Sequence, residues 1–287
     1  IETGKKLEVE LGKKSTFALL NGNKTSTNSP LLSKYLNNGT TDKIEITQFG
    51  EGASIFYATS KAKAVLDEDY TITNGDAAST SVLVANDGAN VEVANGKTLK
   101  TNTNVGLIAT RGAGVSGSGS VAENKGTIQS TRTEKGIGIY TSAANGENSG
   151  TITMQNDPNG NISSTAIAVE TGKVLNDTGS KIQMTGEKAV AIYGATDSDI
   201  TNKGEIKIAT KGTGIVGANS LEKTGAVNQN ITILNDGKIT GTAGEKVIGI
   251  YANNTHATAV SKIKNDTNGI IDLTATKGSL GIYAGKS

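Results

Sequence analysis

The chain has no cysteine and no tryptophan, only 2 prolines and 3% aromatic residues among its 287 positions. The lack of cysteine excludes disulfide bonds and thiolate metal sites. The lack of large aromatic side chains removes the bulkiest fillers of a conventional globular core, so we expect a thin core. No run approaches the 18 apolar residues that a membrane helix requires.

The chain also lacks an excess of positive or of negative charge. The 28 Lys and Arg residues face 27 Asp and Glu, which gives a net charge of +1, and the two signs are interleaved along the chain. Nucleic acid and anionic membranes attract concentrated basic surfaces, so we expect neither as a partner. A hydrophobic content of 35% with near-neutral charge also excludes an intrinsically disordered chain.

Gly, Asn, Thr and Ser are abundant, and they are arranged in a repeat. In six segments an Asn is followed within a few residues by Gly and then by alternating apolar residues, as in Asn202-Lys-Gly204-Glu-Ile206-Lys-Ile208. Consecutive Asn residues are 24 to 33 positions apart. The six are Asn124, Asn148, Asn176, Asn202, Asn235 and Asn265.

Each repeat carries two further short strands, one typified by Ile248-Gly-Ile-Tyr251 and one that runs into the next Asn. Apolar alternation with period two predicts strands and excludes amphipathic helices. Three strands per repeat predict an all-β, right-handed parallel β-helix of about nine coils. We expect residues 1–287 to form a single β-helix segment, with less regular coils over residues 1–50.

The Asn and Gly positions predict a corner of each coil. Gly accepts positive φ at little cost, and Asn tolerates left-handed geometry while its amide bonds to nearby backbone. If the six Asn side chains stack, each can bond to the next and satisfy groups that are otherwise buried and unpaired. We therefore interpret them as structural residues.

The recurring Asn-x-Gly-x-Ile unit followed by Gly-Ile-Tyr-Ala, as in Gly249–Ala252 and Gly281–Ala284, resembles the passenger repeats of large fusobacterial autotransporter adhesins. The resemblance covers residues 124–283 and extends more weakly back to Ile44. It implies that residues 1–287 are a segment of the longer passenger region of a type V secreted chain at the cell surface, anchored in the outer membrane through a C-terminal barrel that lies outside this sequence. It also implies coaggregation with other bacteria and attachment to host cells. No ligand motif of the family matches particular residues.

Right-handed β-helices also host enzymes that cleave polysaccharides, so an enzyme is the rival interpretation. The best acidic clusters, Asp67–Asp69 and Asp197–Asp199, do not recur on neighbouring coils, and we interpret them as solvated loop charges. His256 is the one histidine and forms neither a zinc site nor a triad. Gly112–Gly117 spells G-x-G-x-x-G, but no helix pattern follows it. We expect no catalytic residue, cofactor or metal ion.

Variation in repeat length concentrates between the Tyr position and the next Asn, and loops on a regular scaffold commonly carry binding groups. Residues 218–230 and 252–261 are the prominent segments there. The candidate patch comprises Glu222, Lys223, Asn254, His256, Tyr251 and Tyr283. A host glycan or protein, or the surface of another bacterium, is the expected partner of a monomer. An adhesin, a passive stalk and a carbohydrate-active enzyme remain open.

Overall fold

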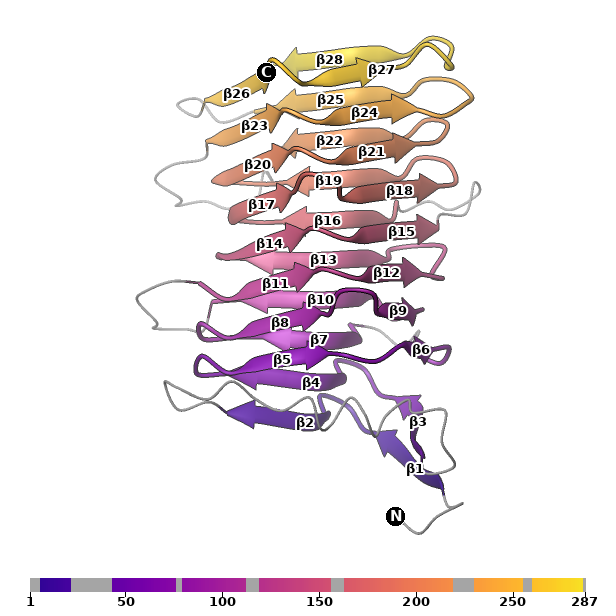
Figure 1. Cartoon of the computed structure of the whole chain (residues 1–287), viewed down its shortest axis with the longest axis vertical. Helices are drawn as coiled ribbons and strands as arrows, with labels where there is room; N and C mark the ends of the chain where they lie inside the picture. The colour runs from indigo at the N-terminus through magenta and orange to yellow at the C-terminus, as the bar shows by residue number, and fades with distance from the viewer. Residues whose placement is uncertain are drawn as a thin grey trace.

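The computed structural model describes residues 6–21, 43–75, 79–111, 119–155, 163–218, 230–254 and 260–285. Every regular element in these ranges is a β-strand. The strands stack one above another into an elongated solenoid, with residues 6–21 at one end and residues 280–285 at the other (Figure 1).

Three parallel sheets form the solenoid. Sheet 1 contains β2 (Thr16–Asn21), β4 (Ser54–Thr59), β7 (Ser81–Ala85), β10 (Val105–Thr110), β13 (Ile137–Ser142), β16 (Thr165–Val169), β19 (Val190–Gly194), β22 (Thr213–Ala218), β25 (Ile248–Asn253) and β28 (Leu280–Gly285). Sheet 2 contains β5 (Lys63–Leu66), β8 (Asn90–Val93), β11 (Val121–Asn124), β14 (Ala144–Asn148), β17 (Gly172–Asn176), β20 (Ser198–Asn202), β23 (Ile231–Asn235) and β26 (Ser261–Asn265). Sheet 3 contains β6 (Tyr70–Ile72), β9 (Thr98–Thr101), β12 (Thr127–Ser130), β15 (Thr151–Gln155), β18 (Lys181–Thr185), β21 (Glu205–Ile208), β24 (Lys238–Gly241) and β27 (Ile270–Asp272).

The chain passes through sheets 1, 2 and 3 in turn and then begins the next coil. From β4 to β27 the described residues form eight complete coils of three strands, and β28 begins a further one. At the other end β2 joins sheet 1, while β1 (Lys6–Leu11) and β3 (Lys43–Phe49) pair only with each other. The parallel β-helix expected from the repeat is confirmed.

The core is a set of stacked aliphatic columns. In sheet 1 the central column is buried from β4 to β25, and it includes Ile139, Ile167, Ile192, Ile215 and Ile250. Each strand pairs with its counterpart one coil away, about 4.8 Å distant, so like side chains pack on like. Burying each Ile contributes about 1.5–3 kcal/mol to stability. Stability therefore resides in contacts between coils.

The six repeat Asn residues occupy one position, the last residue of each strand from β11 to β26 in sheet 2. Their side chains form a continuous ladder in which each amide nitrogen donates to the carbonyl oxygen of the next Asn. The Nδ2–Oδ1 distances are 2.8 Å for the first rung and 2.7 Å for the other four. Asn124, Asn148, Asn176, Asn202 and Asn235 are fully buried.

Gly179 has the positive φ, 82°, that we expected of the repeat glycines, but the other repeat glycines at this corner have a different role. Gly126, Gly150, Gly204 and Gly237 are absent from the positions with positive φ. A Cβ on Gly150 would instead collide with the carbonyl oxygen of Gly126 in the preceding coil. Two-residue turns bring neighbouring coils this close, so glycine is required there by close approach of the backbones and not by left-handed geometry.

Candidate functional site

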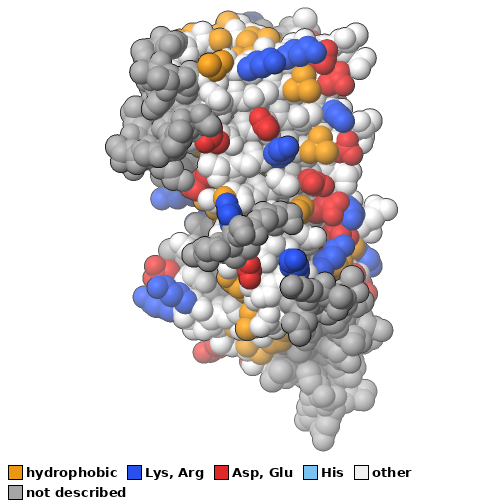
Figure 2. Space-filling model, turned by 90° about the vertical axis from the view of Figure 1, so that its left-hand side faces the viewer, with side chains coloured by type: hydrophobic (Ala, Val, Ile, Leu, Met, Phe, Trp, Pro, Cys, Tyr) orange, Lys and Arg blue, Asp and Glu red, His pale blue; other side chains and the backbone are white. Residues whose placement is uncertain are grey.

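The outer face of sheet 2 presents two rows of side chains that run along the solenoid. The pairing register aligns Lys63, Asn90, Val121, Asn145, Lys173, Asp199, Thr232 and Lys262 in one row. The second row contains Val65, Glu92, Glu123, Glu147, Leu175, Thr201, Leu234 and Lys264. Figure 2 shows the side of the molecule at the left of Figure 1, where lysines and acidic side chains are interspersed with isolated hydrophobic ones.

In the N-terminal half of this face the charges neutralise one another. The carboxylate of Glu92 lies 2.6 Å from the Lys63 ammonium and 3.0 Å from that of Lys125. Lys125 also lies 3.0 Å from Glu123. Burial would raise the pKa of Glu92, but the hydrogen bonds from the two lysines outweigh burial and hold the pKa below its usual value. Each of these four charged side chains is therefore paired within the protein and is not available to a ligand.

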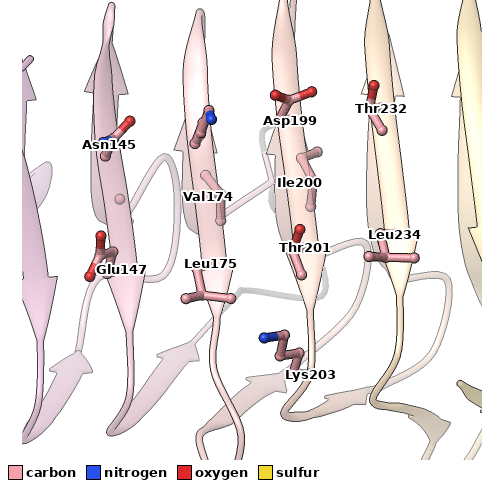
Figure 3. A pocket seen from close by; sticks show the side chains of 12 residues that line it. Asn145, Glu147, Val174, Leu175, Asp199, Ile200, Thr201, Lys203, Thr232 and Leu234 are labelled. Atoms are coloured by element: carbon pink, nitrogen blue, oxygen red, sulfur yellow. The ribbon is translucent and has the colours of Figure 1, made fainter. Parts of the chain in front are cut away.

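The C-terminal half of the same face is different, because it contains a shallow hollow. The cavity has a volume of about 480 Å³ and extends over β14, β17, β20 and β23; we call it the sheet 2 hollow. In Figure 3, Leu175, Thr201 and Leu234 lie in one row, and Asn145, Asp199 and Thr232 lie in the other. Its lining comprises Asn145, Gly146, Glu147, Lys173, Val174, Leu175, Asp199, Ile200, Thr201, Lys203, Thr232 and Leu234.

The polar side chains of the hollow are not bonded to each other. Lys173 and Asp199 are direct register partners on adjacent strands, yet no ion pair joins them. Within the described part of the chain, the side chains of Asn145, Thr201 and Thr232 also form no hydrogen bond. These groups are therefore available to bind an external ligand.

Glu147 marks the boundary between the two halves. Burial raises the pKa of its carboxyl, the neighbouring carboxylate of Glu123 raises it further, and Asp177 adds a smaller increase, against a lowering by Lys125. Its charged form is therefore less favourable than that of an ordinary surface glutamate.

The tyrosines that the repeat places in one position form an outward column on sheet 1, together with Ile108, Ala168 and Val216. Tyr251 and Tyr283 stack with ring centroids 5.1 Å apart and planes 7° from parallel. The Tyr193 hydroxyl donates to the Ala218 carbonyl of the next coil at 3.4 Å. These contacts indicate a structural role for the tyrosines, because ring faces and hydroxyls are used between coils.

Three residues of the predicted binding patch, Glu222, Lys223 and His256, lie outside the described residues, as does the motif at 112–117. β22 pairs with β25 in sheet 1 and β23 pairs with β26 in sheet 2, so the described strands on either side of the two predicted segments lie in adjacent coils. The interpretation of Asn254 as available for contact was wrong. Its exposure is 3%; it directly follows β25, and its backbone N–H donates to the Gly285 carbonyl of the next coil.

The acidic clusters lie apart from one another. Asp69 follows β5, and its carboxylate accepts a hydrogen bond from the Thr98 backbone N–H at 2.8 Å. Asp199 lies on β20 and not in a loop, so the solvated-loop interpretation did not anticipate its place in the hollow. The described residues contain no group of three or more His, Cys, Asp or Glu side chains that could hold a metal ion.

The sequence interpretation missed the sheet 2 hollow because its residues belong to four coils and share no motif. Alternation along each strand does identify Leu175 and Leu234 as outward apolar residues, since each immediately precedes an inward Asn. Aligning the repeats on that Asn would have placed the two leucines in one row. That alignment was the available signal.

Comparison with known proteins identifies the fold family. Residues 54–287 match the family described as BigA third pectate lyase-like domain, a domain of bacterial surface adhesin-type proteins with the right-handed β-helix of pectate lyases. No curated protein and no solved structure matches the chain. The described residues include no helix with the length and hydropathy needed to cross a membrane. The chain belongs to the family of the BigA third pectate lyase-like domain.

Proposed function

We propose that this chain attaches the cell displaying it to host cells or to other bacteria, and that the sheet 2 hollow is its contact surface. The observation that carries the proposal is the unpaired state of Lys173 and Asp199 on a face whose other half is neutralised by ion pairs. Membership of an adhesin-type family supports a role at the cell surface.

We further propose that the chain belongs to an autotransporter passenger anchored in the outer membrane and that it binds without catalysis. The two carboxylates of the hollow, those of Glu147 and Asp199, belong to β14 and β20, two strand spacings or roughly 9.6 Å apart along the solenoid, and to different rows. That arrangement suits contacts along an extended ligand better than joint attack on one bond.

A passive stalk is the second candidate, and the regular stacking of ten strands in sheet 1 favours it. A solenoid holds its shape without any binding site. Binding of the fluorescently labelled chain to epithelial cells and to other bacterial species separates the two. Saturable binding is the result we expect from an adhesin, and absence of binding to every cell type would favour the stalk.

A further inference from the structure

The charges around the sheet 2 hollow balance locally. Two lysines, Lys173 and Lys203, and two acids, Glu147 and Asp199, line it. A polyanionic ligand would meet both carboxylates, and a polycationic ligand would meet both ammonium groups. Charge complementarity therefore favours a ligand without net charge.

The lining also offers two parallel kinds of contact. Leu175, Thr201 and Leu234 follow one another at successive coils and form a mostly apolar row along the solenoid axis. The parallel row presents an amide, a carboxylate and a hydroxyl from Asn145, Asp199 and Thr232 (Figure 3). A pyranose ring has the same combination, a face of C–H groups and a rim of hydroxyls.

The position of the hollow disfavours an extended peptide. It lies on the face of sheet 2, where β14, β17, β20 and β23 each pair with neighbours on both sides. Peptides that add to a sheet bind through free backbone groups at an edge strand. Here recognition rests on side chains alone, which suits a ligand rich in hydroxyl groups.

We propose that the sheet 2 hollow binds an uncharged, extended glycan that lies along the solenoid axis, an inference that rests on the proposed function. The apolar faces of the sugars pack on Leu175 and Leu234, and their hydroxyls bond to Asp199 and Thr232. The hollow spans three strand spacings, and one spacing of about 4.8 Å is close to the length of one sugar ring. About three sugar rings therefore fit.

Affinity measurements on immobilised oligosaccharides test the ligand class. The probes are linear oligosaccharides of glucose, galactose or N-acetylglucosamine, together with uronate-containing and sulfated oligosaccharides. We expect at least one neutral probe to bind and the anionic probes to bind at least tenfold more weakly. Leu175→Ala and Asp199→Ala should each weaken neutral binding about tenfold, whereas Thr153→Ala on sheet 3 should not. Preferred binding of anionic probes, equal binding by all variants or no binding to any neutral probe would overturn the inference.

Periodate treatment of target cells distinguishes this inference from the proposed function. Periodate cleaves sugars that have vicinal diols, and glycosidases remove glycans that lack them, so the two treatments together should abolish attachment. Attachment that survives both treatments would overturn the glycan inference while leaving adhesion intact. Absence of attachment to untreated cells, with retained binding to a neutral oligosaccharide, would overturn the adhesion proposal and leave the glycan site standing.

Discussion

The side-chain nitrogen of Asn148 donates to the side-chain carbonyl oxygen of Asn176 at 2.7 Å. In every rung of the ladder the donor belongs to the earlier coil and the acceptor to the next. A ladder with one direction leaves an acceptor without a donor at its start. The Oδ1 atom of Asn124 is that acceptor, because Val93 occupies the equivalent position one coil earlier. At the other end, Asn265 donates to the Gly269 carbonyl at 2.7 Å.

Asn176→Ala should destabilise the chain by about 2–6 kcal/mol. It leaves the amide of Asn148 and the carbonyl of Asn202 buried without partners, and each such group costs about 1–3 kcal/mol. Thermal unfolding followed by circular dichroism measures the change. Asn145→Ala is the matched control, because this Asn points outward on β14 and should change stability by about 0.5 kcal/mol or less. Equal melting temperatures for the two variants would show that the ladder is dispensable.

Gly150→Ala should destabilise by about 1–3 kcal/mol, because the added methyl group collides with the backbone of the preceding coil. Lys97 occupies the equivalent position in a longer, four-residue turn and is accommodated there. Lys97→Ala should therefore change the unfolding free energy by less than about 1 kcal/mol, through its partly exposed ion pair with Glu68. Denaturant titration of both variants compares them, and a smaller loss for Gly150→Ala than for Lys97→Ala would contradict the close-approach account.

Glu92→Gln should lower stability at pH 7 by about 1–3 kcal/mol, since the carboxylate accepts hydrogen bonds from two lysines. The pKa of Glu92 is lowered on folding from 4.5. Its contribution is therefore present above about pH 4.5 and is lost as the pH falls through the folded-state pKa. Melting temperatures measured from pH 7 to pH 3 should show the variant approaching the wild type at the acid end. A difference that does not depend on pH would contradict the role of the charge.

Glu147→Gln should raise stability at pH 7, the opposite of the effect expected for Glu92→Gln. The pKa of Glu147 is raised on folding, so its contribution to stability is full below the unfolded value of 4.5 and is lost as the pH rises through the folded-state pKa. At neutral pH the charge opposes folding, and the neutral amide removes that cost. The variant should melt above the wild type at pH 7, with the gap closing below pH 4.5. A lower melting temperature at pH 7 would mean that Glu147 has a favourable partner.

The solenoid could be predicted from the sequence because equivalent side chains stack in successive coils, and this stacking requires a repeating pattern. Every inward position pairs with its equivalent one coil away, so Ile192 and Ile250 recur in register and the Asn spacing marks each coil. The N-terminal strands β5, β6 and β9 were not anticipated, because Leu66 and Val93 replace Asn there and the motif is lost. Aliphatic residues fill the same corner without leaving a signature.

The candidate site was less predictable, because an outward surface is subject to no packing rule. Lys173 and Asp199 are ordinary charged residues in their own strands, and only the register between β17 and β20 makes them neighbours. The predicted patch relied on loop length, which identifies a corner but no geometry. Asn254 illustrates the limit, since loop length placed it on the surface and its exposure is 3%.

The most direct test of the central claim compares two arginine substitutions in a cell-attachment assay. Thr201 on β20 lies in the floor of the sheet 2 hollow, and Thr153 on β15 is a half-buried, outward threonine on sheet 3. Both Thr201→Arg and Thr153→Arg should fold with wild-type melting temperatures. We predict that Thr201→Arg fills the hollow and reduces attachment at least tenfold, whereas Thr153→Arg attaches like the wild type. Equal attachment by the two folded variants would contradict the assignment of binding to sheet 2.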